Sequence, residues 1–252
     1  MIHDPWFYLA ALPAVFLMGL AKGGFAGVSV LSMPLMALVM PPIEAAAIML
    51  PILMVQDVVS VWTYRHDFDK KVLAILVGGS LFGIALGAAL AAHVSNALIE
   101  LFVGLIAAGY VFYAWMKGHM KPGEPAPTRV APGLFWGGVG GFTSFIANAG
   151  APPFQVYVLP LRLKPQTYAG TGTMFFAIIN WIKFVAFYFL GQVSPGHLET
   201  SAILFPPAIA ATFFGIWLVR RTESDRFYKI IYAITLAVGV FLIWVGIRHL
   251  MG

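Results

Sequence analysis

Hydrophobic residues form long unbroken stretches that are separated by short polar connections. Six of these stretches are each near the ~20 residues that a helix needs to cross a bilayer: 43–64, 71–92, 97–117, 165–190, 198–219 and 226–248. Two further apolar segments, 5–40 and 131–162, are interrupted by glycine-rich sequences. Each is too short for two full crossings at the helical rise per residue. We therefore expect each to form a re-entrant hairpin of two shortened helices that meet at the glycine-rich break.

The second half of the chain loosely repeats the first, about 123 positions later. The break at Gly19–Gly27 matches the break at Gly140–Gly150, and Asp57 then aligns with Asn180. Two halves with interrupted hydrophobic segments at matching places are typical of secondary transporters, and the interruptions mark the binding site. The predicted units are a first membrane repeat at 1–117, a cytoplasmic linker at 118–130 and a second membrane repeat at 131–252.

The loops fall into a basic group and a group without basic residues. Lys and Arg gather in four connections: Arg65/Lys70/Lys71, Lys117/Lys121/Arg129, Arg162/Lys164 and Arg220/Arg221/Arg226/Lys229. The connections at 92–97 and 191–200 have none. The positive-inside rule makes the four basic loops cytoplasmic. Counting crossings then puts Pro41 outside, its counterpart Lys164 inside and both termini in the periplasm.

Equivalent points on opposite sides of the membrane indicate inverted repeats. The sequence therefore predicts an all-α polytopic membrane protein of two inverted repeats. Each repeat is a broken, re-entrant helix hairpin followed by three transmembrane helices.

Composition supports a membrane protein and excludes several other classes. Sixty per cent of the residues are hydrophobic and ten per cent are charged, whereas about a quarter are charged in soluble proteins. The chain has no cysteine, and therefore no disulfide or thiolate metal site. The net charge of +5 lies in loops between apolar runs, so we expect no nucleic-acid partner. A Walker A loop is also missing, so this chain itself hydrolyses no ATP.

Three ionisable residues fall inside the apolar segments. They are Lys22 in the first break, Lys183, and Asp57 near the middle of a span. Such a group costs at least ~2.5–3.5 kcal/mol on insertion scales, so it normally faces a cavity or a partner. Lys22 either contacts substrate, snorkels to the interface or is neutralised by Asp57. Lys183, one turn beyond Asn180, is either a ligand or a snorkelling lysine.

Asp57 is the candidate for carrying a coupling proton, and its alternative role is to neutralise Lys22 or Lys183. Buried opposite charges usually pair, which favours the structural role.

The glycine-rich breaks are the predicted substrate site. Non-helical backbone at membrane depth survives where it is buried in protein or lines an aqueous cavity. Half-helices that start at a break direct positive dipole ends into that cavity, which suits an anion. The predicted substrate-binding residues are Lys22, Gly23, Gly24, Gly27, Ser29, Gln56, Thr143, Ser144, Asn148, Gly150, Asn180 and Lys183. No metal site or cofactor is expected.

Two glycine-rich sequences carry a family resemblance: the first break, Gly19-Leu20-Ala21-Lys22-Gly23-Gly24-Phe25-Ala26-Gly27, and the opening of the second half, Gly137-Gly138-x-Gly140-Gly141-Phe142. Both resemble the TauE/SafE sulfite-exporter family. Pro41-Pro42 and Ala45–Ala47 add to this resemblance, which covers nearly the whole chain. It implies a multi-pass protein of the bacterial inner membrane that moves sulfite, organosulfonates, sulfoacetate or related anions. It also implies a homodimer as one possible assembly. Ser144 stands where Lys22 would repeat, so we expect an asymmetric site.

The leading functional prediction is a secondary transporter for a small anion, a sulfur oxyanion or sulfonate. We expect it to be proton-coupled and to work by alternating access around a midplane site. A permease for small carboxylates would use the same positive site and remains open. An anion channel would need a continuous polar pore rather than one midplane cluster. An intramembrane enzyme would need a nucleophile–base pair or metal ligands at depth, and no mid-span histidine is present. We therefore expect a transporter and not an enzyme.

Overall fold

The computed structural model describes residues 5–40, 42–90, 93–117, 124–189 and 195–251. The predicted turn at Pro41, residues 118–123 of the linker, the loop at 190–194 and the terminal residues 1–4 and 252 lie outside the described residues. Where the chain is described it is all-helical, without a strand. Its α-helices are α1 (Pro5–Gly23), α2 (Ser32–Ala37), α3 (Pro42–Tyr64), α4 (Lys70–Leu90), α5 (Asn96–Met116), α6 (Val130–Ala147), α7 (Ala151–Val158), α8 (Pro165–Phe189), α9 (Pro195–Arg221) and α10 (Ser224–Met251).

The six predicted unbroken spans correspond to α3, α4, α5, α8, α9 and α10, with ends within a few residues of the prediction. Proline is the first residue of α3, α8 and α9, a position where its missing N–H costs no hydrogen bond. Seven helices in the described chain are long and apolar enough to cross a membrane: α1, α3 from Ala47, α4, α5, α6, α9 and α10. The 25-residue α8 carries Asn180 and Lys183 and is not among the seven.

The expectation of two shortened helices in each hairpin is wrong for the first arm. α1 has 19 residues and α6 has 18, so each first arm is long enough to span the bilayer. Only the return arms are short. They consist of the 3-10 turn Val28–Leu31 with α2, and of α7 with the 3-10 turn Leu159–Leu161.

Close packing explains why α1 continues through its glycines. A Cβ added to Gly19 would lie 2.4 Å from the Cβ of Ala211, and one added to Gly23 would lie 2.5 Å from the backbone of Gly215. The two glycines therefore form a flat surface that lets α1 approach α9 at backbone distance. They stabilise the helix through this contact rather than ending it.

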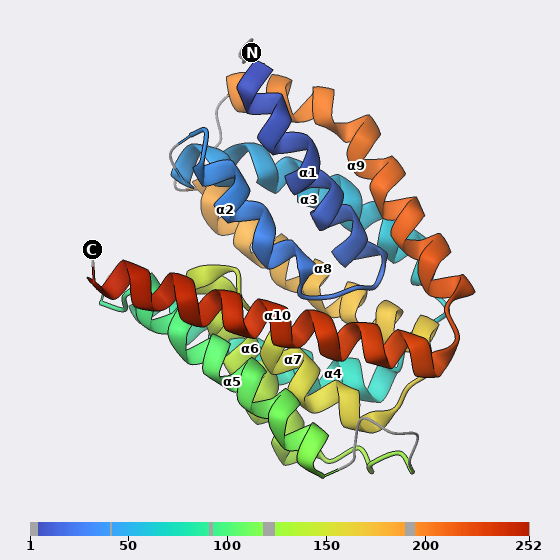
Figure 1. Cartoon of the computed structure of the whole chain (residues 1–252). Coiled ribbons are helices and arrows are strands. Elements are labelled where there is room, and N and C mark those ends of the chain that lie inside the picture. The colour runs from blue at the N-terminus through green and yellow to red at the C-terminus, as the bar shows by residue number, and fades with distance from the viewer. Residues whose placement is uncertain (1–4, 41, 91–92, 118–123, 190–194, 252) are drawn as a thin grey trace.

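Each broken segment packs against a helix of the other half. α1 packs against α9, and α6 packs against α4. α3 contacts α8, and α5 contacts α10. In the predicted repeat, α3 corresponds to α8 and α5 corresponds to α10, so each of these two pairs joins a helix to its counterpart in the other half. In Figure 1, α1, α2, α3 and α9 form the upper part of the molecule, and α4, α5, α6, α7 and α10 form the lower part. The two halves of the sequence therefore intertwine instead of forming separate bodies.

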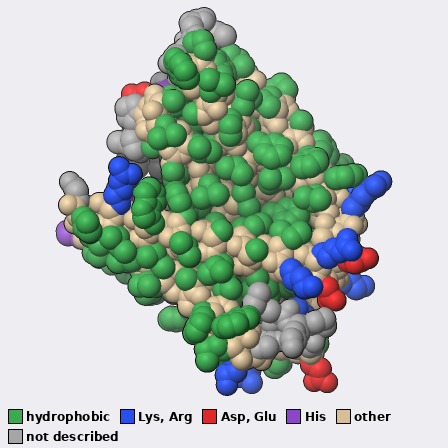
Figure 2. Space-filling view, viewed as in Figure 1, with side chains coloured by type: hydrophobic (Ala, Val, Ile, Leu, Met, Phe, Trp, Pro, Cys, Tyr) green, Lys and Arg blue, Asp and Glu red, His purple; other side chains and the backbone are tan. Residues whose placement is uncertain are grey.

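The outer surface is apolar. Leucine, phenylalanine and tryptophan side chains from most long helices are exposed, among them Phe82, Leu105, Phe135 and Trp244. Figure 2 shows hydrophobic side chains over most of the visible face, with Lys and Arg mainly at its right and lower edges. Such a surface is compatible with a hydrocarbon environment and not with water.

Candidate functional site

In each break, a residue with positive φ follows the preceding helix. After α1, the amide of Phe25 donates to Leu20 O at 3.1 Å, and Gly24 has φ +132°. After α6, the amide of Ala149 donates to Thr143 O at 3.2 Å, and Asn148 has φ 52°. The first bond spans five residues, as in a Schellman closure, and the second spans six; each passes a residue with positive φ. Glycine tolerates this backbone at no steric cost, and asparagine is among the few other residues that adopt it readily.

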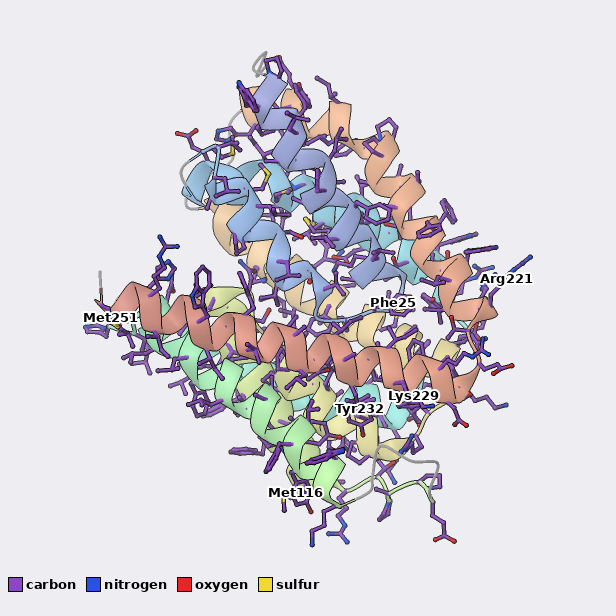
Figure 3. All side chains as sticks on the ribbon, viewed as in Figure 1. Phe25, Met116, Arg221, Lys229, Tyr232 and Met251 are labelled. Atoms are coloured by element: carbon purple, nitrogen blue, oxygen red, sulfur yellow. The ribbon has the colours of Figure 1, made fainter. Side chains whose placement is uncertain are left out.

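The first break is held in place by the second half of the chain. Gln155 Nε2 of α7 donates to Ala26 O at 2.7 Å, and its Oε1 accepts from Thr235 Oγ1 of α10 at 2.9 Å. Phe25 lies beside α10 (Figure 3), where its ring centroid is 5.7 Å from that of Phe227. Buried polar backbone is therefore paired here, as its depth requires.

Lys22, the penultimate residue of α1, forms an ion pair with Asp57 of α3. Lys22 Nζ lies 2.5 Å from Asp57 Oδ1, and Asn180 Nδ2 of α8 donates to Asp57 Oδ2 at 2.9 Å. All three side chains are buried, with Asp57 fully so. Both oxygens of the carboxylate are therefore paired, and the charges of Lys22 and Asp57 compensate each other. Of the two lysines that could neutralise Asp57, Lys22 is the one that pairs with it.

Lys183 also lies in the interior rather than snorkelling. Its Nζ donates to Asn148 Oδ1 at 2.7 Å, to Ser144 O at 3.2 Å and to Ser144 Oγ at 3.3 Å. These three acceptors are neutral, and Lys183 is only 5% exposed. Its ammonium group is therefore hydrogen-bonded but has no carboxylate as a direct partner in the described chain. The turn that holds the Lys183 ammonium group is the second break.

Lys22 and Lys183 both line a cavity of about 120 Å³ between the breaks. This is room for several water molecules or a small anion, since one water needs roughly 10–15 Å³ of such space. Of the predicted site residues, the structure brings eight to the cavity wall: Lys22, Gly27, Ser29, Ser144, Asn148, Gly150, Asn180 and Lys183. Asp57 is not part of this wall, because Lys22 and Asn180 lie between its carboxylate and the cavity.

The other predicted residues lie near the cavity but serve the fold. Gly23 packs against Gly215, and its carbonyl accepts from Tyr64 Oη at 2.6 Å. Gln56 Nε2 donates to Val15 O and Ala208 O at 3.4 and 3.3 Å. Thr143 donates to backbone carbonyls of its own break, including Ala149 O at 3.1 Å. None of these three lines the cavity.

A second, smaller cavity lies beside the first. It has a volume of about 20 Å³, enough for about one water, and Gly24, Tyr168 and Thr173 form part of its wall. Lys22 and Phe176 line both cavities. The Lys22 side chain and the Phe176 ring therefore stand at the boundary between a larger and a smaller space.

Helix dipoles contribute less positive potential to the cavity than the sequence predicts. α7 begins Ala151-Pro152-Pro153, so two of its first three residues have no N–H to offer an anion. Gly150 and Ala151 do line the cavity. An anion there would thus depend mainly on the lysine side chains.

The apolar part of the wall was missed by sequence reasoning. Besides three alanines, seven large hydrophobic side chains line the cavity: Met18, Met33, Met49, Leu50, Leu53, Phe145 and Phe176. Ser32, also on the wall, donates to Ala14 O at 2.9 Å. Because apolar residues make up most of every span, no signal in the sequence distinguishes those that face the cavity.

Comparison with known proteins identifies the class and then the family. The fold and the buried lysines define a polytopic membrane protein with a central cationic cavity. The family described as sulfite exporter TauE/SafE matches residues 11–242, and the chain belongs to this family. Membership implies a membrane transporter for sulfur anions such as sulfite, and the family is one of transporters rather than enzymes. Neither the curated proteins nor the solved structures gave a match.

Proposed function

We propose that the protein is a secondary transporter that binds one small sulfur anion, a sulfite or an organosulfonate, in the cavity between the two breaks. The observation that carries this proposal is the excess of positive charge there. Lys22 and Lys183 both reach the cavity, and Asp57 compensates only one of them. A buried cation without a counter-charge is costly, and a bound anion would remove that cost.

The mixed character of the wall favours an anion with an organic part. The wall offers the Lys183 ammonium group and the Asn180 amide, and Met18, Met49 and Phe145 add apolar surface. An organosulfonate presents both a charged head and a hydrocarbon portion. Ligand pockets typically combine a mostly apolar wall with a few placed polar groups in this way.

Alternating access is supported by the two cavities that share Lys22 and Phe176. A substrate held at Lys22 would pass from the larger to the smaller space if the helices around Phe176 moved apart. Transporters built from inverted repeats bind substrate at the repeat interface and rock one part against another. The inverted arrangement itself is supported by the positive-φ residue that follows the first helix of each break and by the exchange of partners between α1–α9 and α6–α4.

An uptake screen on purified protein in proteoliposomes tests the function. We expect transport of sulfite or of short alkyl and aryl sulfonates, and no transport of matched carboxylates such as acetate and benzoate. Carboxylates transported as well as the matched sulfonates would favour the alternative of a carboxylate permease. Conductance without saturation would indicate a channel.

The proposed membrane orientation has both termini in the periplasm. Arg221 and Lys229 lie at one side of the molecule, and Met251 at the end of α10 lies at the opposite side (Figure 3). The end of α10 would therefore face away from the basic α9–α10 connection, which the positive-inside rule makes cytoplasmic.

Cysteine labelling from outside intact cells tests this orientation, because the chain has no native cysteine. A Pro41→Cys variant should react with a membrane-impermeant maleimide, and a Lys164→Cys variant should react only after the cells are permeabilised. The reverse pattern would show that the orientation is wrong.

A further inference from the structure

An open groove lies on the outer surface between α3 and α8. It has a volume of about 270 Å³, and its wall consists of Asp57, Val58, Val61, Trp62, Arg65 and Trp181. Val58, Trp62 and Trp181 are each at least half exposed, so the groove opens on the apolar face that meets hydrocarbon. It shares no lining residue with the anion cavity. Lipid chains are expected to fill such a space in a membrane, because an empty groove would lose the dispersion contacts of its lining.

The length of the groove matches the depth of one leaflet. Asp57, Val61 and Arg65 are spaced four residues apart and therefore follow one side of α3. Eight residues of helix rise ~12 Å, and one leaflet supplies about half of the ~30 Å hydrocarbon core. Arg65 directly follows α3, which ends at Tyr64, in a connection that the positive-inside rule makes cytoplasmic. The groove therefore has room along its length for an acyl chain of the cytoplasmic leaflet.

Only the outer end of the groove carries an uncompensated charge. At the deep end, Lys22 and Asn180 pair with both carboxylate oxygens of Asp57, so that end suits hydrocarbon. At the outer end, Arg65 forms no ion pair with a carboxylate in the described part of the chain. Its guanidinium lies 4.2 Å from the ring centroid of Trp62 and donates to the Trp62 carbonyl. These contacts hold the guanidinium at the mouth of the groove and leave its other N–H donors for a phosphate.

We infer that the α3–α8 groove binds one anionic phospholipid of the cytoplasmic leaflet, with an acyl chain along its apolar wall and the phosphate on Arg65. An anionic headgroup fits better than a zwitterionic one, because the cation of a zwitterionic headgroup would stand beside the Arg65 guanidinium. The lipid packs against the outer side of the helix pair that is joined by the Asp57–Asn180 hydrogen bond. Its binding does not depend on which anion the protein transports.

Lipid titration of the delipidated protein in detergent tests the headgroup part of the site, with bound lipid counted by native mass spectrometry. We expect the wild type to bind one phosphatidylglycerol more tightly than a phosphatidylcholine with the same acyl chains. Arg65→Gln should weaken phosphatidylglycerol binding roughly fivefold, the contribution of one basic residue beside an anionic lipid. Arg221→Gln is the matched control. Arg221 also lies over a tryptophan, 5.1 Å from the ring centroid of Trp217, but it is not part of the groove wall (Figure 3), so this variant should bind like the wild type.

A second pair of variants tests the acyl-chain part of the site. Val58→Trp places a large apolar side chain in the groove, at a position that is 60% exposed, and should remove the tight phosphatidylglycerol site. Val240→Trp places the same side chain on α10, at a position that is 56% exposed and outside the groove, and should keep the site.

Three results would overturn the inference. Equal weakening by Arg65→Gln and Arg221→Gln would show that the lipid responds only to the total surface charge. Tight binding retained in Val58→Trp would place the lipid outside the groove. Glycerol phosphate bound as tightly as the whole lipid would show that the mouth of the groove takes a free phosphate ester without an acyl chain. The proposed transport function would stand in each case, because none of these measurements involves the transported anion.

Discussion

Lys183→Gln should abolish net transport of the anion and leave the protein folded. Glutamine can still donate to Asn148 and Ser144, but it removes the one ammonium group of the cavity that lacks a carboxylate in direct contact, among the described residues. A hydrogen bond to a charged group contributes about 1.5–3 kcal/mol, which corresponds to roughly a 10- to 150-fold loss of affinity. Binding titrations and uptake assays on the same preparation measure the effect.

Lys22→Gln is the informative comparison for this prediction. It also removes a cation, but it leaves Asp57 fully buried without its ion-pair partner. Breaking a buried pair from one side costs about 3–5 kcal/mol. We therefore expect Lys22→Gln to lower both affinity and thermal stability, and Lys183→Gln to lower affinity alone. Unchanged affinity in Lys183→Gln would place the anion away from the second break.

Asp57→Asn should lose accumulation driven by a pH gradient and retain counterflow exchange. Asparagine cannot take up the coupling proton, whereas exchange needs no net proton movement. The variant also leaves Lys22 buried without a counter-charge, so its stability in detergent should fall by about 3–5 kcal/mol. Saturating anion should restore much of that stability, since a ligand that binds only the folded state stabilises it.

Three measurements on this one variant separate the two roles of Asp57. They are accumulation, exchange and melting temperature with and without anion. Equal loss of accumulation and exchange at saturating anion would show that Asp57 only neutralises Lys22. Retained accumulation would show that the coupling proton is carried elsewhere.

The long spans were predictable because their signal is local. A continuous apolar run that ends in charges fixes a helix such as α4 or α10 within a few residues. The end of α1 was not predictable in the same way. Gly19, Gly23 and Gly24 can each end a helix, and the choice depends on Ala211 and Gly215 of α9, which lie almost two hundred residues later in the chain.

The candidate site was likewise predictable only in part. The sequence identifies Lys22, Asp57 and Lys183 because charges are rare inside apolar segments. It cannot tell which lysine pairs with Asp57, since this depends on how α1, α3 and α8 are arranged in space. The pairing with Lys22 leaves Lys183 to the neutral acceptors of the second break, and so gives the two lysines different roles.

The exchange of partners between the halves has a consequence for synthesis. α1 leaves the ribosome early, but the helix that covers its glycine face, α9, follows more than 170 residues later. At 5–20 residues per second this delay is roughly 10 to 30 seconds. During that time the charge of Lys22 can already be compensated, because Asp57 follows only 35 residues behind it. Lys183 in turn is made after Ser144 and Asn148, the acceptors that receive it. Each buried lysine therefore has a partner 35 residues away in the chain, and the partner of Lys22 is synthesised long before α1 can dock against α9.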